Sequence, residues 1–270
     1  MKIVTFNVNG IRARLHQLQR LVEKHRPDII AVQEIKCVDD AFPQAAISEL
    51  GYHSEVFGQK GHYGVALLSL QKPVNVCRNF PDSDPQAQRR LIVGTWVDSN
   101  KRPLVVMNGY FPQGESREHP EKFPAKRKFY ADLFGYINSD FKPTDNLLIV
   151  GDMNVAPGDL DIGIGDKNAQ RWLKTGKCSF LPEEREWLNR LMAWGTHDLY
   201  RELHPDCNKW LSWFDYRSGG FEDEPRRGLR IDLMLATKPL RERCISAEID
   251  YEIRGMEKPS DHAPVLVEFS

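Results

Sequence analysis

Residues 147–154 read Leu147-Leu148-Ile149-Val150-Gly151-Asp152-Met153-Asn154, an apolar run that ends abruptly in a glycine, a carboxylate and an amide. Four consecutive apolar residues bounded by polar ones predict a short buried strand. A second run of this kind, Ile29-Ile30-Ala31-Val32, ends on Gln33-Glu34. Buried strands need helices or a second sheet to cover their faces. These two stretches therefore predict an α/β fold.

Strand-like and helical segments alternate along most of the chain. Further strands are predicted at Ile3 to Val8, Val65 to Leu70, Leu91 to Val97, Leu104 to Asn108, Trp210 to Tyr216, Leu229 to Ala236, Cys244 to Ile249 and Val265 to Phe269. Helices are predicted at Ala41 to Leu50, Ala125 to Ile137, Glu183 to Trp194 and around Leu15, Leu18, Leu21 and Val22. Two long irregular stretches, Phe111 to Phe123 and Val155 to Pro182, have the length of functional loops.

The composition indicates a globular, soluble protein. Hydrophobic residues make up 41% and charged residues 28% of the 270 residues, which excludes disordered and fibrous classes. The five cysteines are scattered and form no C-x-x-C motif, so the sequence argues against disulfides and a zinc site and for a reducing compartment. The first strand begins at the N-terminus, where a secretory signal would need an apolar stretch. We therefore expect a cytoplasmic protein with no membrane segment.

The net charge of −1 gives no overall attraction to nucleic acid. An enzyme acting on DNA with this balance must place its positive charge locally. Four basic clusters are candidates, although any one of them is more often ordinary solvated surface. They are Arg89-Arg90, Lys126-Arg127-Lys128, Lys167 to Lys177, and Arg226-Arg227 with Arg230.

Acidic and amide residues stand at or beside five predicted strands. They are Asn7, Glu34, Asp152 with Asn154, Asp232, and Asp261 followed by His262. One carboxylate at a strand end is most often a cap or a turn residue, but five such points are harder to explain in that way. Converging carboxylate and amide oxygens suit Mg²⁺ or Mn²⁺ and not zinc. The pattern predicts a site for a hard divalent cation.

Two further features allow more than one interpretation. A buried histidine is usually neutral and bonded to the backbone, but His262 directly follows Asp261, which favours a histidine oriented for phosphoryl chemistry. The aromatic stretch Trp210 to Tyr216 is equally compatible with core packing on alternate faces and with a flat apolar surface for a sugar or base.

Six segments together resemble the exonuclease III family of AP endonucleases, within the endonuclease/exonuclease/phosphatase superfamily. They are Ile3 to Asn7, Val32 to Lys36, Asn108 to Pro112, Gly151 to Asn154, Arg230 to Asp232 and Ser260 to Pro264, and they occur in the order typical of that family. The resemblance extends through the intervening stretches and covers essentially the whole chain. It implies two packed β-sheets flanked by helices, a four-layer α/β sandwich, in one domain spanning residues 1–270.

The resemblance also implies an activity. Members of the family hydrolyse duplex DNA 5′ to abasic sites, clear blocked 3′ ends and degrade DNA from 3′ ends. Their cofactor is Mg²⁺, for which Mn²⁺ is expected to substitute. The implied partner is double-stranded DNA with abasic sites or 3′ ends, bound by a monomer that contacts no membrane.

Residue roles follow from the same resemblance. Glu34 is implied as the principal metal ligand, and the other residues assigned to the metal site are Asn7, Asp152, Asn154, Asp261 and His262. Asp152, oriented by Asn154, activates water, and His262, held by Asp232, stabilises the phosphate charge. Tyr110 contacts the scissile phosphate, and substrate binding is assigned to Arg90, Trp213, Phe214 and Leu229. The sequence leaves open whether Asp152 or His262 takes the proton of the water.

Two rival hypotheses can be weighed against this one. A related enzyme acting on a lipid or inositol phosphate would share the acidic motifs but lack the aromatic cluster around Trp213 and the two long loops. A DNA-binding module without activity would lack one of the carboxylates, and none is missing.

Overall fold

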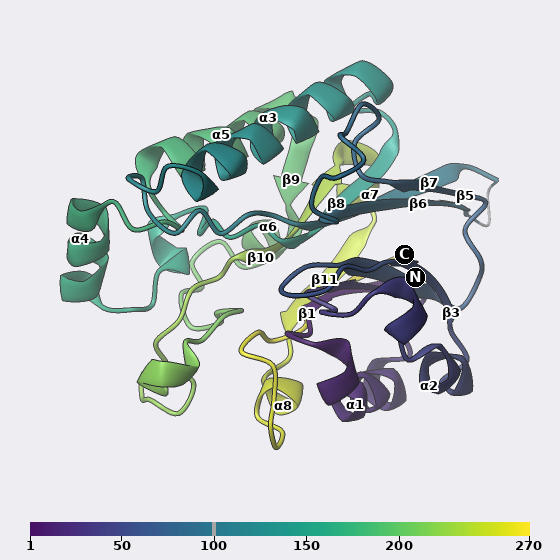
Figure 1. Ribbon diagram of the computed structural model, residues 1–270, viewed down its shortest axis with the longest axis horizontal. Coiled ribbons are helices and arrows are strands. Elements are labelled where there is room, and N and C mark those ends of the chain that lie inside the picture. The colour runs from purple at the N-terminus through teal and green to yellow at the C-terminus, as the bar shows by residue number, and fades with distance from the viewer. Residues whose placement is uncertain (99–100) are drawn as a thin grey trace.

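Two six-stranded mixed β-sheets form the centre of the computed structural model, which describes residues 1–98 and 101–270. The sheets pack face to face, and helices cover their outer faces, so that the molecule has four layers (Figure 1). This arrangement confirms the predicted four-layer α/β sandwich. The two chain ends lie side by side, because the first and last strands pair in the same sheet.

The first sheet has the strand order β11-β12-β1-β2-β4-β3. Its strands are β1 (Lys2–Asn7), β2 (Ile29–Gln33), β3 (His53–Phe57), β4 (Val65–Ser69), β11 (Cys244–Ile249) and β12 (Val265–Phe269). Strands β1 and β2 run parallel with Asn7 opposite Gln33, whereas β1 and β12 are antiparallel. The parallel pair therefore brings Asn7 and the residue after Gln33, Glu34, to the same edge of the sheet.

The second sheet has the strand order β5-β6-β7-β8-β10-β9. Its strands are β5 (Asn75–Arg78), β6 (Leu91–Val97), β7 (Pro103–Tyr110), β8 (Asn146–Asp152), β9 (Thr196–Asp198) and β10 (Asp232–Thr237). Strands β7 and β8 are parallel with Tyr110 opposite Asp152, and β10 is antiparallel to β8 with Asp232 opposite Asp152. Three predicted site residues thus share one edge of this sheet.

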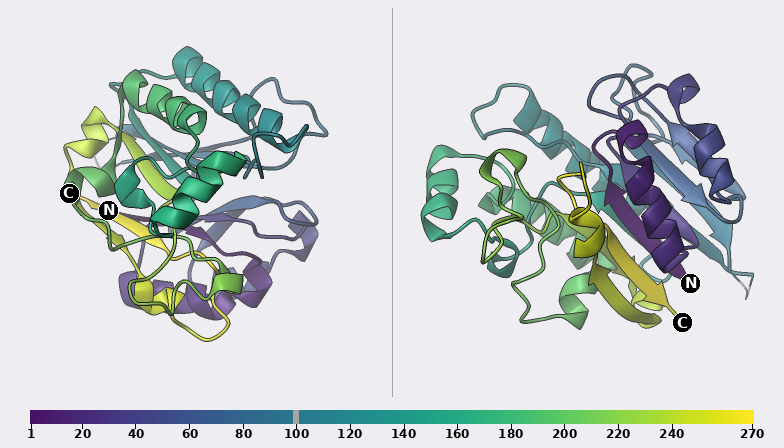
Figure 2. Two further views of the ribbon diagram at one scale, coloured as in Figure 1. Left: turned by 90° about the vertical axis from the view of Figure 1, so that its left-hand side faces the viewer. Right: turned by 90° about the horizontal axis from the view of Figure 1, so that it is seen from below.

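The helices lie mainly outside the sheets. They are α1 (Leu15–His25), α2 (Gln44–Glu49), α3 (Lys122–Asp140), α4 (Asp166–Thr175), α5 (Pro182–Gly195), α6 (Leu199–Leu203), α7 (Lys238–Arg241) and α8 (Tyr251–Arg254), with short 3₁₀ turns at Ile11–Ala13, Asp39–Ala41, Asp159–Asp161 and Tyr216–Ser218. Helices α1, α2 and α8 cover the first sheet, α3 and α5 cover the second, and α4 projects to one side (Figures 1 and 2). None of the described helices is long and apolar enough to cross a lipid bilayer.

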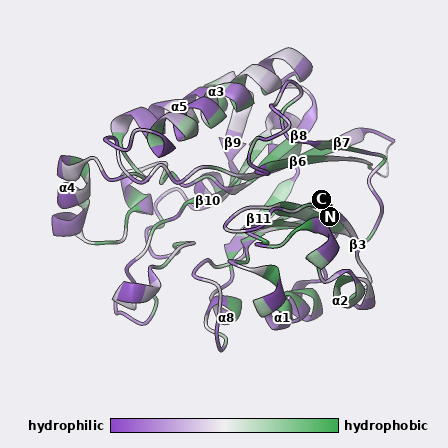
Figure 3. Ribbon diagram, in the orientation of Figure 1, coloured by the Kyte–Doolittle hydropathy of each residue, from purple (hydrophilic) through white to green (hydrophobic). Residues whose placement is uncertain are grey.

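Both faces of the central strands are buried, which explains their continuous apolar sequence. In β1, Ile3 belongs to the core between the two sheets, whereas Val4 and Phe6 pack in the layer under α1. Apolar residues accordingly concentrate in the strands, and polar ones on the outer sides of the helices (Figure 3). Because side chains alternate along a strand, Asn7 lies on the same face as Ile3, toward the second sheet. As the last residue of β1, it lies at the edge of the sandwich.

Several predicted elements are wrong or incomplete. The predicted strand Trp210 to Tyr216 is instead an irregular segment that makes isolated bridges only, from Trp213 to Leu229 and His262. Its aromatic side chains do not alternate between two faces of a sheet, because Phe214 packs into a separate cluster with Leu211 and Phe221. The predicted strand Leu229 to Ala236 begins only at Asp232.

The stretch Val155 to Pro182 is not wholly irregular, since it contains α4 and a 3₁₀ turn. Helix α4 was missed because Trp172 is its one buried residue, so its sequence carries little apolar signal. Strands β3 and β5 were missed for a similar reason. Both lie at sheet edges, and their side chains are largely exposed or half-buried. Edge strands of this kind lack the apolar run that marks central ones.

Candidate active site

The two sheets bring predicted site residues from both halves of the chain to one end of the sandwich. Asn7 ends β1, Glu34 follows β2, and Tyr110 and Asp152 end β7 and β8. Asp232 begins β10, and His262 precedes β12. The carboxyl ends of parallel strands meet at one edge, which is where α/β proteins build their sites. The fold therefore assembles this site from segments that lie far apart in the chain, between Asn7 and His262.

Asp152 lies at the centre of this cluster. Its Oδ2 atom accepts a hydrogen bond of 2.9 Å from Asn7 Nδ2 and lies 3.7 Å from His262 Nε2. The other ring nitrogen of His262, Nδ1, lies 2.8 Å from Asp232 Oδ2. Asp232 itself is fixed by its backbone, whose amide donates to the hydroxyl of Ser212. The imidazole is thus held between two carboxylates.

Glu34 belongs to the same cluster through Asn7. The Asn7 side chain donates to Glu34 Oε1 at 2.9 Å as well as to Asp152, and its oxygen accepts from the Asn9 amide. The Lys36 ammonium lies 3.0 Å from Glu34 Oε2 and also donates to Asn9. Asn9 and Lys36 were not predicted as site residues. The only sequence signal for Asn9 is that it is a second residue with an amide side chain, two positions after Asn7.

The backbone around the site is strained. Asn9, Glu34, Lys36 and Asn154 all have positive φ angles between 45° and 55°, in the left-handed region that non-glycine residues rarely adopt. Such conformations cost free energy and persist where the surroundings enforce them, often at functional sites. Gly151 is required for a different reason, because a Cβ atom there would lie 1.9 Å from the carbonyl oxygen of Gly109.

Asn154 orients Asp152 through the backbone. The Asn154 amide donates to Asp152 Oδ1 at 3.0 Å, so both oxygens of the carboxylate have fixed donors. The Asn154 side chain donates to the Phe111 carbonyl at 3.0 Å. Asp261 lies at the periphery, where its oxygens accept from Asn9 Nδ2 and from the indole of Trp213.

The electrostatics of the cluster separate the two central groups. Burial, together with the charges of Asp232 and Glu34, raises the pKa of Asp152 to about 7, against the opposing charge of His262. Burial alone would lower the pKa of His262, but the carboxylates of Asp232 and Asp152 outweigh it and raise that pKa to about 10. Burial and the same negative surroundings raise the pKa of Tyr110 well above its usual range. At neutral pH the imidazole is therefore charged and the phenol is protonated.

Arg90 lies beside this cluster. Its guanidinium carbon is 4.7 Å from the ring centroids of both Tyr63 and Tyr110, and Nη1 donates to the Tyr110 carbonyl at 3.0 Å. Its Nε donates to Gln88, whose amide in turn donates to the hydroxyl of Tyr63. The structure therefore places Arg90 against Tyr110, and sequence reasoning did not identify Tyr63 or Gln88, which complete the stack.

The three apolar residues assigned to substrate binding differ in exposure. Trp213 is half-buried and its indole nitrogen donates to Asp261 at 3.1 Å, so it borders the cluster directly. Phe214 and Leu229 have no exposed surface, and the Phe214 ring packs against Phe221 and Tyr251. A sugar would contact Trp213 without rearrangement, whereas it would reach Phe214 or Leu229 only if their neighbours moved.

The donor set fits a hard cation. Ligand atoms of Glu34, Asp152 and His262 lie within 4.8 Å of one another. The Asp232 Oδ1 atom is buried and meets no hydrogen-bond partner among the described residues, which leaves one carboxylate oxygen of the cluster unsatisfied. Carboxylate oxygens are the ligands that Mg²⁺ and Mn²⁺ prefer. Between Asp232 and Asp152, the charged imidazole of His262 also supplies positive charge to the cluster.

Comparison with known proteins agrees with this geometry. Residues 4–262 match the endonuclease/exonuclease/phosphatase family. The chain belongs to that family. It is 55% identical, over 269 residues and the full length of both chains, to an exodeoxyribonuclease III of Haemophilus influenzae.

Two solved structures of family members also superpose closely. A 3′ phosphatase from Neisseria bound to a product DNA hairpin has a TM-score of 0.88 and 35% identity, with 100% of this chain and 99% of that chain covered. An AP endonuclease from Archaeoglobus fulgidus has a TM-score of 0.89 and 35% identity, with the same coverage. The family that the sequence motifs predicted is thereby confirmed, and this family member is an exodeoxyribonuclease III homologue with a nuclease fold.

Proposed function

We propose that the chain is a DNA repair nuclease that hydrolyses phosphodiester bonds in duplex DNA. It would remove nucleotides and blocking groups from 3′ ends and cut internally 5′ to abasic sites. One observation carries the proposal. Asp152 is fixed by the Asn154 amide on one oxygen and by Asn7 on the other, directly beside a histidine that Asp232 holds charged. Hydrolysis of a phosphodiester needs this pairing of an aligned base with a positive group.

A divalent cation, Mg²⁺ or Mn²⁺, belongs to this proposal. Glu34 would hold it, with Asn7 and Asp261 nearby. When bound, the cation neutralises negative charge that develops on the phosphate oxygens. Lys36 now lies 3.0 Å from Glu34 Oε2, where its ammonium offsets part of the same acidic charge.

Asp152 is the group that takes the proton of the attacking water. A pKa near 7 suits a base that works at neutral pH, because a substantial fraction of the group is then ionised and still basic. His262 holds its own proton through Asp232, and its Nε2 lies 3.7 Å from Asp152 Oδ2, beside the base. It therefore stabilises negative charge in the transition state. The proposal thus assigns the proton of the water to Asp152 and not to His262.

Tyr110 and Arg90 would bind the scissile phosphate. The phenol of Tyr110 stays protonated and can donate a hydrogen bond, and the guanidinium of Arg90 packs against its ring. A charged donor and a neutral donor on the same side complement the dianionic character of the transition state.

The decisive assay uses a labelled duplex that carries a single abasic analogue. We expect cleavage 5′ to the analogue with Mg²⁺ or Mn²⁺, none with EDTA, and recovery when either ion is restored. Shortening of an intact duplex from its 3′ ends should follow the same dependence. Rescue by zinc alone would contradict the metal assignment, and absence of both cleavage reactions would contradict the function.

Trp213 provides a test of substrate class. Trp213→Ala removes a stacking surface worth roughly 1–3 kcal/mol and should lower abasic cleavage far more than hydrolysis of bis-p-nitrophenyl phosphate. Trp213→Phe, the matched control, keeps a ring but loses the indole donor to Asp261. It should retain most of the abasic cleavage. If Trp213→Ala lowered both reactions equally, the residue would support the fold and not the substrate.

The proposal also covers the number of domains, the oligomeric state and the cellular compartment of the protein. Because β1 pairs with β12 and Asn7 and His262 serve one site, we propose that residues 1–270 form one domain that acts as a monomer. All five cysteines are free, which supports a reducing compartment such as the cytoplasm. Gel filtration with light scattering would test the monomer.

A further inference from the structure

Lys126 and Glu184 form an ion pair buried between helices α3 and α5. Their side chains have no exposed surface, and Lys126 Nζ lies 2.5 Å from Glu184 Oε1. The prediction that Lys126 belongs to a basic surface cluster is therefore wrong for this residue. Neither group contacts the carboxylates of the active site, so the chemistry proposed above does not explain why a charge pair is kept here.

The contacts of this pair lead to three segments around the active site. The Lys126 ammonium also donates to the carbonyl of Asn154 at 2.8 Å and to that of Gln113 at 3.2 Å, which uses all three of its protons. The second oxygen of Glu184, Oε2, accepts from the amides of Ser179 and Leu181, each at 2.8 Å. The pair thus ties the turn after β8 to the loop after β7 and to the segment before α5.

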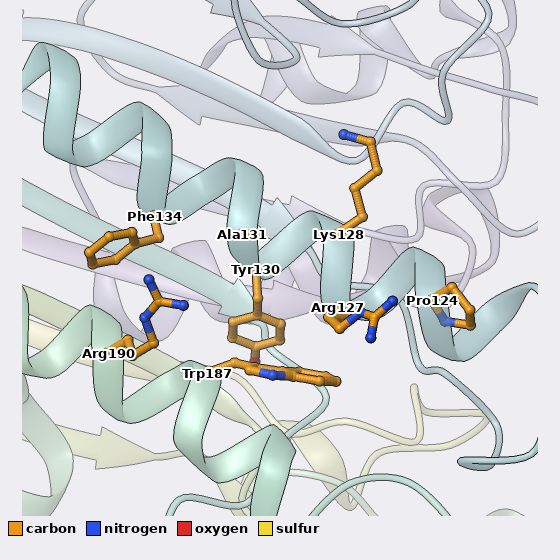
Figure 4. A pocket seen from close by; sticks show the side chains of 8 residues that line it. All are labelled: Pro124, Arg127, Lys128, Tyr130, Ala131, Phe134, Trp187 and Arg190. Carbon is orange, nitrogen blue, oxygen red and sulfur yellow. The ribbon is translucent and has the colours of Figure 1, made fainter.

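Tyr130 fixes the same turn through a second hydrogen bond. It follows Lys126 by four residues and so lies on the same face of α3. Its hydroxyl donates to the carbonyl of Met153 at 2.8 Å, and burial raises its pKa well above the usual range, which keeps the donor protonated. Figure 4 shows its ring pointing from α3 toward Trp187 of α5, with the centroids 6.0 Å apart. Helix α3 therefore binds two consecutive carbonyls, those of Met153 and Asn154.

The energetics point to positioning and not to stability. Replacing a buried ion pair by neutral residues of similar size is often neutral or stabilising, because two charges no longer have to be desolvated. The turn, by contrast, needs an external hold, since Asn154 has a φ of 53°. The Asn154 amide, which shares a peptide unit with the Met153 carbonyl, in turn donates to the Asp152 carboxylate. A shift of that unit, or of the following one that Lys126 binds, would therefore move the carboxylate.

We propose that Lys126 and Glu184, with Tyr130, are positioning residues of the reaction. They hold the turn from Asp152 to Asn154 in its strained conformation, so that the carboxylate stays aligned with the attacking water. The inference rests on the proposed function only in that Asp152 acts as the base. A misplacement of about 1 Å can lower turnover about a hundredfold, so a remote pair can have a large effect.

The test compares three sets of variants of the full chain. Lys126→Met with Glu184→Gln removes both charges and keeps the shape of the pair. Glu184→Gln alone is the contrasting variant, because it leaves the Lys126 charge buried without a counter-charge. Lys238→Ala with Glu242→Ala is the matched control, since both side chains of this i,i+4 pair are exposed and neither belongs to a basic cluster named above. Thermal unfolding, abasic cleavage at saturating Mg²⁺, and hydrogen–deuterium exchange of residues 151–157 are measured for each.

The charge-free variant should unfold at a temperature close to that of the wild type. Its kcat should fall at least about tenfold while KM changes less than about twofold, because alignment is lost and substrate binding is not. Exchange in residues 151–157 should become faster. Glu184→Gln should unfold at a clearly lower temperature than the charge-free variant, because only the single variant leaves a buried charge unpaired. The control pair should change nothing.

Two results would overturn the inference. Unchanged exchange at residues 151–157 would show that the pair does not hold the turn, and faster exchange with unchanged kcat would show that the hold does not matter for the reaction. If the charge-free variant does not fold, Tyr130→Phe decides, since removal of one hydroxyl should lower kcat about two- to tenfold. Unchanged kcat in Tyr130→Phe would then overturn it. A wild-type enzyme without cleavage would contradict the proposed function instead, because the exchange measurement needs no activity.

Discussion

Arg230 and Asp232 are two residues apart and equally buried, yet they belong to opposite kinds of charge cluster. Arg230 bonds to Asp161 at 2.7 Å and to Asp198 at 2.6 Å, and Arg201 also contacts Asp161, so two cations meet two carboxylates. Asp232 belongs to a cluster in which two buried carboxylates, Asp232 and Asp152, share the one imidazole of His262, and Asp232 Oδ1 meets no hydrogen-bond partner among the described residues.

The difference between the two clusters lies in how far the charges of each are neutralised by their neighbours. In the Arg230 cluster each charge is neutralised, which is the condition under which buried charges do little chemistry and hold segments together. In the Asp232 cluster, burial together with the neighbouring charges of Asp232 and Glu34 raises the pKa of Asp152 to about 7. The paired charges around Arg230 hold segments of the scaffold together. The carboxylates around Asp232, two residues further along the chain, make the site reactive.

The largest expected effect comes from unbalancing the first cluster. Arg230→Met would leave Asp161 and Asp198 buried with one fewer cation, which should destabilise the fold by about 3–5 kcal/mol. Urea unfolding monitored by tryptophan fluorescence measures this directly. A loss below about 1 kcal/mol would mean that the comparison between the clusters is wrong.

The second expected effect falls on turnover and not on folding. Asp152→Asn and His262→Asn should each lower kcat at least about a hundredfold, the scale of losing a base or a charge-stabilising group. Both variants should fold. Asp152→Asn should be at least as stable as the wild type, because it removes a carboxylate that Asp232 and Glu34 repel. Near-normal turnover in either variant would show that the site is wrongly assigned.

A smaller effect should appear with pH. Burial would raise the pKa of Asp161, but Arg230 and Arg201 outweigh it and lower that pKa. A depressed pKa contributes stability above the unfolded value near 3.9, and this contribution is lost as the pH falls toward the folded value. The unfolding free energies of wild type and Asp161→Asn should therefore differ most above about pH 5 and converge below about pH 4. A difference that stays constant from pH 3 to 7 would contradict the role of this carboxylate.

The smallest effect is expected at an exposed pair. Lys238 and Glu242 lie 3.7 Å apart on α7 with side chains 70% and 57% exposed. Water screens such a pair, so Lys238→Ala should change the unfolding free energy by less than about 1 kcal/mol and leave turnover unchanged. A larger loss of stability would show that burial is not what separates strong from weak pairs in this chain.

Much of the fold could be predicted from local pattern. The central strands β2, β4, β6 and β8 carry apolar runs because both of their faces are buried, and helix α5 shows its apolar face in Trp187, Leu188, Leu191 and Met192. Segments whose environment is set by distant residues could not be predicted in this way. The aromatic stretch around Phe214 looks like a strand, but its side chains pack against Phe221 and Tyr251 from other segments.

The sequence by itself determined which groups stand at strand ends, because the polar residue that follows an apolar run is a local feature. Asn7, Glu34 and Asp152 can be identified in this way, whereas Asp232 stands inside a predicted strand and His262 just before one. The family resemblance supplies the expected roles of all five. Only the tertiary structure decided which charges are balanced, since a partner such as Asp161 lies 69 residues from Arg230 in the chain. Arg230 and Lys126 look like surface charges in the sequence, and both are buried because the carboxylates that neutralise them arrive from other elements of the fold.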